Sequence, residues 1–132
     1  MSGTEARVPV VAAVIRRDGL YLVCRRPDGK RHGGLWEFPG GKVREGETRE
    51  AAVRRELAEE LALETVGLGA VLFSAPDEGA AFVIEFVETA VEGEPVLHEH
   101  SEVGWFTPGQ LAGLGLAPAD ARFVSTLSGD PG

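Results

Sequence analysis

Residues 40–63 read GGKVREGETREAAVRRELAEELAL, and they decide how the middle of the chain folds. Three glycines within the first seven residues of this stretch predict a loop. From Thr48 to about Leu61 there follow strong helix formers, with neither glycine nor proline among them. Thr48 can serve as the N-cap, and Glu50 suits the positive end of the helix dipole. The stretch therefore predicts a glycine-rich loop that leads directly into a helix.

Three glutamates gather on one side of this predicted helix. At about 100° per residue, Glu56, Glu59 and Glu60 fall in one sector, while apolar residues fill an adjacent sector that can pack against a core. Like charges at these spacings oppose helix formation by a few tenths of a kcal/mol per pair. Bound Mg²⁺ or Mn²⁺ prefers oxygen ligands and would offset that repulsion. An ordinary solvated helix face is the alternative interpretation of the three glutamates alone.

Length and composition fit one compact domain over residues 1–132. The chain is 43% apolar, which is enough for a single core, and 132 residues are too few for two ordinary domains. Its longest apolar runs are far shorter than a membrane span, and no charged-then-apolar signal segment begins the chain. We therefore expect a soluble cytoplasmic protein with no membrane partner.

The net charge of −8 is unevenly distributed, with +5 on residues 1–55 and −13 on residues 56–132. An acidic chain is a poor candidate for gripping a nucleic acid polymer, which needs a broad basic surface. A small phosphate group needs only a few cations, and Arg26 and Lys42 lie just before or within the opening stretch. These two residues are candidate phosphate ligands, and ordinary surface charge is the alternative for each.

The remainder of the chain alternates strand-like runs with turns. Strands are expected at residues 8–15, 20–26, 35–38, 65–73, 80–89 and 101–106. A turn is expected at residues 75–79, a short helix is expected to begin at Pro108, and a final helix is expected at residues 118–127. Strands before, between and after two principal helices indicate an α+β domain, an α/β/α sandwich with a mixed sheet.

Eight residues of the opening stretch stand at the offsets G-x5-E-x7-R-E-U-x-E-E-x-G-U, where U is an aliphatic residue. They are Gly41, Glu47, Arg55, Glu56, Leu57, Glu59, Glu60 and Leu63. This pattern is the Nudix signature, so the chain resembles the Nudix hydrolases, which mostly hydrolyse a nucleoside diphosphate linked to a further group. Ala62 is the one departure, since the family pattern has glycine there. A glycine would cap the helix in the left-handed conformation, in which alanine costs on the order of 1 kcal/mol unless the helix ends differently.

The flanking residues narrow the resemblance to one branch of that family. Residues 36–42, WEFPGGK, resemble the run found in MutT-like proteins and in CTP pyrophosphohydrolases, and residues 116–120, LAPAD, resemble a base-pocket segment of both groups. With these flanks the resemblance covers about residues 10–127. It implies a Nudix fold, with helices on both sides of a mixed central sheet and the signature helix beside the active site.

The resemblance also implies a metal cluster built on the signature. Glu56 and Glu60 would ligate the metal, and Glu59 would be a further ligand or the base that activates water. The backbone carbonyl of Gly41 would complete the cluster. Glu99 matches a further acidic residue that many MutT-like proteins use near the metals. The implied cofactor is Mg²⁺ or Mn²⁺.

Four more residues take roles from the same resemblance. Arg55 would orient the neighbouring carboxylates, Glu47 especially. Phe38 and Asp120 would contact the nucleobase. A carboxylate at Asp120 can accept a hydrogen bond from the exocyclic amine of cytosine, and equally from the ring N–H and amine of a guanine. The LAPAD run favours the cytidine branch, whereas a solvated carboxylate in the first turn of a helix is the alternative for Asp120.

The sequence thus predicts a metal-dependent nucleoside triphosphate pyrophosphohydrolase that releases a monophosphate and pyrophosphate. The expected substrates are (d)CTP-like nucleotides or the oxidised guanine nucleotide 8-oxo-dGTP, as in sanitation of the nucleotide pool. One alternative is hydrolysis of ADP-ribose or of dinucleoside polyphosphates, and another is a nucleotide-binding regulator that has lost catalysis. The expected partner is a small nucleotide, with no nucleic acid polymer, and the expected state is a monomer or homodimer.

Overall fold

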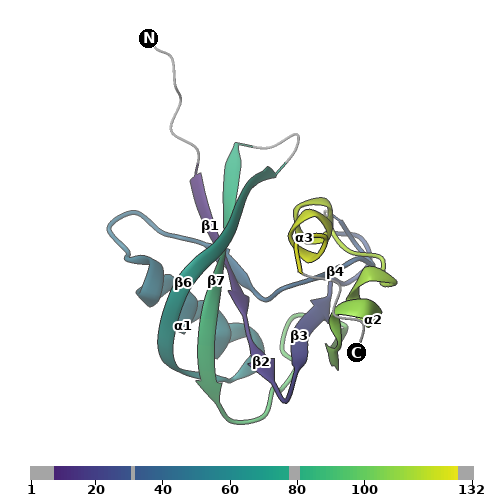
Figure 1. The fold of residues 1–132 in the computed structure, drawn as a ribbon. Coiled ribbons are helices and arrows are strands. Elements are labelled where there is room, and N and C mark those ends of the chain that lie inside the picture. Colours follow the sequence, from purple (N-terminus) through teal and green to yellow (C-terminus); the bar gives the residue numbers. More distant parts are fainter. Residues whose placement is uncertain (1–7, 31, 78–80, 128–132) are drawn as a thin grey trace.

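The computed structural model describes residues 8–30, 32–77 and 81–127 (Figure 1). Its elements are, in chain order, β1 (Val8–Val14), β2 (Arg16–Arg17), β3 (Leu20–Arg25), β4 (Trp36–Glu37), β5 (Gly40–Lys42), α1 (Arg49–Leu61), β6 (Glu64–Asp77), β7 (Phe82–Glu92), β8 (Glu102–Phe106), α2 (Pro108–Ala112) and α3 (Pro118–Val124). The signature stretch therefore forms the predicted helix, α1, at the predicted place.

The strands form two four-stranded sheets. The first has the order β5-β1-β7-β6 and is mixed, because β1 runs parallel to β7 while the other two pairings are antiparallel. In the second sheet β3 is central. β8 pairs with one edge of β3, and β2 and β4 both pair with the other edge. This follows from the register, because Tyr21 of β3 pairs with β2 and β8, and Cys24 of β3 pairs with β4 and β8.

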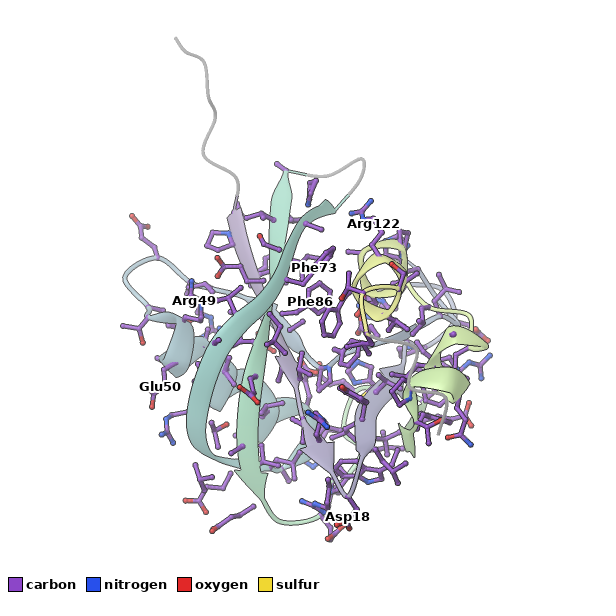
Figure 2. The ribbon with its side chains drawn as sticks, in the orientation of Figure 1. Asp18, Arg49, Glu50, Phe73, Phe86 and Arg122 are labelled. Carbon is purple, nitrogen blue, oxygen red and sulfur yellow. The ribbon has the colours of Figure 1, made fainter. Side chains whose placement is uncertain are left out.

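The core lies on both faces of β1, because successive side chains of a strand point to opposite sides. Val11 belongs to the apolar cluster that contains Leu57 of α1. Ala12 belongs to a second cluster, which contains Phe123 of α3. Figure 2 shows Phe86 of β7 directed towards α3, where its ring stacks on Phe123 with the centroids 4.7 Å apart. Helices therefore cover both sides of the mixed sheet, which confirms the predicted α/β/α sandwich.

Both ends of α1 follow from its sequence. Thr48 is the N-cap, and its hydroxyl oxygen accepts a hydrogen bond from the N–H of Ala51 at 3.0 Å. At the other end Ala62 adopts the left-handed conformation, with φ 56° and ψ 32°. Its N–H donates to the carbonyl of Ala58, as in a helix that ends on glycine. The helix thus keeps the exit that glycine favours and places an alanine in it.

The glycine-rich run before α1 was predicted to be entirely loop, and this was wrong, because Gly40–Lys42 forms β5. β5 pairs antiparallel with β1, with Gly41 opposite Val11. A side chain at Gly40 would overlap the carbonyl oxygen of Val11, so only glycine allows this backbone approach. The second glycine-rich part, around Gly46, is a turn as expected.

The ends of β6 and α3 also differ from the prediction. β6 continues to Asp77, through residues predicted to begin a turn, because β7 pairs with them as well. Pro76 is compatible with this strand, since β6 lies at the edge of its sheet. Glu78 and Gly79, the remainder of the expected turn, lie outside the described residues. α3 ends at Val124, three residues before the predicted end of the final helix.

Candidate active site

Arg55 of α1 is the centre of a hydrogen-bond network. Its Nε and Nη2 donate to the two carboxylate oxygens of Glu47 at 2.8 and 2.9 Å. Its Nη1 donates to Glu56 Oε2 at 2.9 Å and lies 3.6 Å from Glu59 Oε1. Nη2 also donates to the backbone carbonyl of Lys42 at 3.0 Å. One guanidinium therefore ties the loop, β5 and the carboxylate side of α1 together.

The network stabilises the ionised form of Glu47. The hydrogen bonds from Arg55, and then the one from the backbone N–H of Arg44, lower the pKa of Glu47 from its ordinary value to about 2. The same pairing with Glu47 raises the pKa of the Arg55 guanidinium. Both groups are therefore charged at every pH at which an enzyme works.

The signature begins with a glycine, Gly41, because the structure leaves no room for a side chain there. A side chain at this position would overlap the carboxylate of Glu56. Gly41 lies opposite Val11 in the sheet, and Val11 faces α1. The glycine thus lets the carboxylate of Glu56 lie directly on the backbone of β5, which brings that carboxylate next to the Gly41 peptide.

Glu60 is a buried carboxyl, only 4% exposed. Burial, then the neighbouring Glu56, and more distantly Glu37 and Glu99, raise the pKa of Glu60 well above its usual range. Its Oε1 atom is buried and has no hydrogen-bond partner among the described residues. A crowded, unsatisfied carboxyl of this kind is costly unless a cation neutralises it.

The connection between β7 and β8 covers the C-terminal end of α1. The N–H of Val96 donates to the carbonyl of Leu61 at 2.8 Å, and the N–H of His98 donates to the carbonyl of Glu60 at 3.2 Å. These contacts satisfy carbonyls that a helix end leaves unpaired. They also bring the next two residues, Glu99 and His100, to the carboxylate cluster, where His100 Nδ1 lies 3.9 Å from Glu60 Oε1.

The donor set fits a divalent cation. Across residues 8–30, 32–77 and 81–127, no three acidic, histidine or cysteine side chains already converge as a finished metal site. Glu60 nevertheless presents an unpartnered buried oxygen, with Glu56 and Glu99 close enough to raise its pKa. Carboxylate oxygens are the ligands that Mg²⁺ and Mn²⁺ prefer, and a bound cation would remove the repulsion between these groups.

Two adjoining cavities lie beside this cluster. The first, of about 310 Å³, is lined by β1, β4, β5, β7 and the beginning of α3. The second, of about 590 Å³, reaches the carboxylates of Glu60 and Glu99. Arg26, Glu37 and Gly40 line both cavities, so these three residues stand at the junction between them. A molecule with one end in the first cavity can extend through this junction to the carboxylate cluster.

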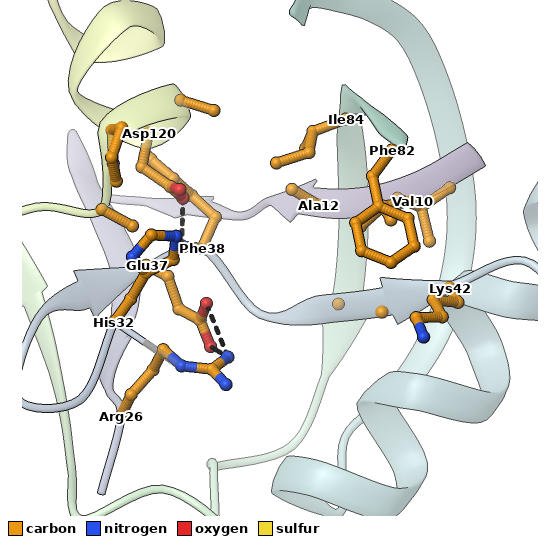
Figure 3. A pocket seen from close by; sticks show the side chains of 16 residues that line it. Val10, Ala12, Arg26, His32, Glu37, Phe38, Lys42, Phe82, Ile84 and Asp120 are labelled. Atoms are coloured by element: carbon orange, nitrogen blue, oxygen red, sulfur yellow. Dashed lines mark hydrogen bonds and ion pairs between the residues drawn. The ribbon is translucent and has the colours of Figure 1, made fainter. Parts of the chain in front are cut away.

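The first cavity has an apolar wall with polar residues at its two ends (Figure 3). Ala12 and Ile84 form part of that wall. Asp120 lies at one end, where its Oδ2 accepts a hydrogen bond from the N–H of Phe38 at 2.9 Å. At the other end Lys42 Nζ lies 4.8 Å from the centre of the Phe82 ring.

A family model of the NUDIX domain matches residues 6–127 of the chain. The chain belongs to the Nudix family. It is 39% identical to the CTP pyrophosphohydrolase of Escherichia coli over 123 residues, which are 91% of this chain and 90% of that protein. It is 37% identical to a putative 8-oxo-dGTP diphosphatase 2 of Mycobacterium tuberculosis, over 90% of this chain and 86% of that protein.

Solved structures of Nudix proteins share the fold. A MutT Nudix hydrolase from Burkholderia pseudomallei superimposes with a TM-score of 0.80 at 28% identity, covering 94% of this chain and all of that one. This Nudix protein is a nucleotide pyrophosphohydrolase, and Nudix hydrolases generally use divalent metal ions. In the part of the chain that the structure describes, no helix is long and apolar enough to cross a membrane.

The structure gathers most of the Nudix signature residues that the sequence singled out. Arg55 contacts Glu47 and Glu56 as expected, while Glu59 stays exposed at the edge of the cluster. Glu99, from a segment far along the chain, lines the same cavity as Glu60. What each of these residues does in catalysis stays a prediction.

Three of the expected substrate-binding residues lie in surroundings that the sequence did not predict. Asp120 is buried, so a solvated carboxylate is the wrong description of it. Phe38 is 3% exposed as a residue, and its ring packs edge-on against Phe123, so it belongs mostly to the core. Lys42 lies on the cavity face of β5, opposite the face that meets α1. It is paired with Val10, which is paired in turn with Ile84, and all three residues line the first cavity. Its ammonium is therefore separated by the β5 backbone from Glu56.

Sequence reasoning missed two residues of the site, Glu37 and His100. Glu37 accepts hydrogen bonds from Arg26 and from His100, and its carboxylate lies at the junction of the cavities. Glu37 is part of the WEFPGGK run, and His100 directly follows Glu99, so both were next to residues already chosen. Nothing in their spacing connects them, since 63 positions separate them along the chain.

Proposed function

We propose that this Nudix enzyme hydrolyses a nucleoside triphosphate to a monophosphate and pyrophosphate, with Mg²⁺ or Mn²⁺, and that a cytidine nucleotide is its preferred substrate. One observation carries the proposal: a cavity with a buried carboxylate, Asp120, opens through a shared junction into a cavity that contains the carboxylates of Glu60 and Glu99. A base in the first cavity and phosphates in the second would fit this order.

The carboxylates of Glu56 and Glu60 would hold the metal, with the carbonyl of Gly41, and with Glu59 and Glu99 from the exposed side. When bound, the metal supplies a lowered pKa for the attacking water and neutralises phosphate charge. Arg55 would keep Glu56 on the backbone of Gly41 through its contacts with Glu47. Glu59 is exposed and so is available to take the proton of the water.

The cations would position the phosphates. Arg26 stands at the junction of the cavities and carries a guanidinium, which suits phosphate oxygens. Lys42 lies at the far end of the first cavity, over Phe82, and would reach a phosphate only by turning around the β5 edge. We therefore assign the larger share of phosphate binding to Arg26.

Asp120 would read the base. An ionised carboxylate offers about four acceptor positions on two oxygens, and the N–H of Phe38 occupies one of them. The exocyclic amine of cytosine is a donor that could use another. The similarity to a CTP pyrophosphohydrolase supports this choice, and the similarity to 8-oxo-dGTP diphosphatases supports oxidised guanine as the second candidate. Either activity would remove unwanted nucleotides from the pool.

A kinetic comparison tests the proposal. We expect kcat/KM to be highest for a cytidine nucleotide when CTP, dCTP, 5-methyl-dCTP, dGTP and 8-oxo-dGTP are compared with Mg²⁺ and with Mn²⁺. A higher value for 8-oxo-dGTP would assign the enzyme to the second candidate. Turnover of ADP-ribose or of dinucleoside polyphosphates alone would contradict the proposal, and binding without any pyrophosphate release would indicate a regulator.

The assembly and cellular place of the enzyme belong to the proposal too. We propose that it acts on free nucleotides in the cytoplasm, as a monomer or homodimer, and that it does not bind nucleic acid polymers. The strongly acidic second half of the chain supports the last point, because a polyanion would be repelled from it. Sedimentation with and without a DNA or RNA oligonucleotide tests the oligomeric state and the absence of nucleic acid binding.

A further inference from the structure

Hydrogen bonds connect three side chains at the junction of the two cavities. Arg26 Nη1 lies 3.2 Å from each carboxylate oxygen of Glu37. His100 Nε2 lies 2.9 Å from Glu37 Oε2. An ionised carboxylate only accepts hydrogen bonds, so the imidazole is the donor in this contact. The order Arg26, Glu37, His100 therefore runs from the shared opening into the protein.

Burial increases in this order. The side chain of Arg26 is 30% exposed, that of Glu37 is 20% exposed and that of His100 is 7% exposed. The outer end thus faces solvent and any bound molecule, while the inner end is fixed. His100 is fixed further by its own segment, because the backbone of Val96 and His98 is hydrogen-bonded to the end of α1.

An arginine at a phosphate site is useful only where it is held. A free arginine side chain samples many rotamers and loses that freedom when it binds a ligand. A carboxylate that contacts the guanidinium beforehand reduces this loss, provided that the carboxylate itself cannot move. Glu37 meets this condition because the N–H of His100 restrains one of its oxygens.

We propose that His100 is a positioning residue, which acts through Glu37 to hold the guanidinium of Arg26 at the junction where the phosphates of the substrate pass. The inference rests on the proposed function, since it assumes that phosphates pass this junction. It does not depend on which base the enzyme prefers. Its consequence is that His100 contributes to binding of the phosphate chain without touching it.

The first test compares two substitutions of His100. His100→Ala removes the donor, whereas the side-chain amide of His100→Gln can place an N–H near the former position of Nε2. We expect His100→Ala to raise KM by about tenfold with a smaller change in kcat, and His100→Gln to recover most of that loss. A fall in kcat at unchanged KM, with no recovery in His100→Gln, would overturn the proposal and indicate a role at the carboxylate cluster.

The second test asks whether His100 acts through Arg26. In an Arg26→Ala background, His100→Ala should raise KM by less than about twofold, because the group that it positions is already gone. KM changes that multiply in the double variant would overturn the proposal. The same comparison is made for binding alone, from the intrinsic tryptophan fluorescence during titration with an unhydrolysable α,β-methylene nucleotide, so that it does not require turnover.

A matched control is provided by a neighbouring ion pair between β3 and β8. Arg25 Nη1 donates to Glu102 Oε1 at 3.1 Å, and neither residue lines the two cavities. Glu37→Gln should raise KM, whereas Glu102→Gln should leave it unchanged. Equal changes in both variants would overturn the proposal, as general loosening of the sheet would then explain them. The assays use the best nucleotide of the wild-type panel, so an incorrect base assignment alters that panel and leaves these comparisons valid.

Discussion

The two faces of β5 carry contacts of very different range along the chain. On the face towards α1, Arg55 contacts Glu47, Glu56 and the carbonyl of Lys42, all of which lie within 13 residues of it. Beside the cavity face, the N–H of Phe38, which precedes β5, donates to Asp120 across 82 residues. The contacts of Arg55 are therefore made within a single loop and helix, whereas the contact of Asp120 needs the completed fold.

This difference separates two functions of the site. The α1 face contains the groups proposed to hold metal, and all of them except Glu99 belong to the signature stretch. The cavity face contains the groups proposed to select the base, and its shape depends on how α3 is placed, because Asp120 of α3 accepts the N–H of Phe38. Substitutions on the α1 face should therefore change the rate for every substrate alike, and substitutions on the cavity face should change the ranking of substrates.

The largest effect is expected on the α1 face. Glu56→Gln should lower kcat by at least about 100-fold for all nucleotides while the fold stays intact, because it removes a negative oxygen from the metal site. The measurement is steady-state turnover at saturating Mg²⁺, with circular dichroism to check folding. Near-normal turnover would remove Glu56 from the proposed site.

Glu50 provides the control on the same helix. It projects outward from the molecule in Figure 2, and its carboxylate pairs with Arg54 at 2.8 Å on the exposed side of α1. An exposed pair of this kind contributes at most about 1 kcal/mol. Glu50→Gln should therefore leave kcat unchanged, and a comparable loss in this variant would mean that the helix as a whole responds to charge.

The second effect concerns the cavity face. Asp120→Ala should reduce the ratio of kcat/KM between the best and the poorest base by at least about tenfold, with turnover of the poorest substrate little altered. Asp120→Asn can still accept the N–H of Phe38 through its carbonyl oxygen, so it separates loss of base recognition from loss of the structural contact. A ranking of bases that survives both substitutions would place recognition elsewhere, for example on the backbone beside Phe38.

The same contrast explains how much the sequence could predict. The helix, its N-cap and the grouping of Glu56 with Glu60 followed from residues within one stretch, and the contact between Arg55 and Glu47 followed from the family resemblance that this stretch carries. Helical periodicity and fixed offsets are sufficient to place side chains that are close along the chain.

The cavity face could not be predicted in this way. That Glu37 and His100 meet depends on how the segment after β7 lies across the end of α1, which no local pattern encodes. β5 was missed because two glycines resemble a loop, whereas the neighbouring β1 offers an edge that only glycine can approach closely. Tertiary packing, and not propensity, decided both cases.

The third prediction concerns stability on the α1 face. The folded protein raises the pKa of Glu60 above its unfolded value, so without metal the folded state holds the proton more tightly than the unfolded chain does. This contribution to stability is full below the ordinary glutamate range and is lost as the pH rises towards the raised pKa. Glu60→Gln removes the ionisation and should stabilise the metal-free protein by about 1 kcal/mol or more at pH of about 8.

Thermal unfolding in the presence of a chelator measures this effect. The Tm of the variant should exceed that of the wild type by about 3 °C or more at pH of about 8, and the gap should narrow towards pH of about 5. Added Mg²⁺ should raise the Tm of the wild type more than that of Glu60→Gln, because the variant has lost a ligand. A Tm difference that does not vary with pH would contradict the assignment of the effect to ionisation of Glu60.

The smallest effect concerns the exit of α1, where Ala62 holds the left-handed conformation at φ 56°. Glycine adopts this conformation without steric cost, so Ala62→Gly should stabilise the protein by up to about 1 kcal/mol and raise its Tm by about 3 °C.

Ala58 supplies the opposite case, since it is an exposed residue inside the same helix. Ala58→Gly should destabilise by about 1 kcal/mol, because glycine in a helix interior gains nothing and loses more backbone entropy on folding. The same chemical change should thus have opposite signs four residues apart, and kcat should stay constant in Ala62→Gly. Destabilisation by both substitutions would show that the strain at Ala62 is relieved in solution by a different helix end.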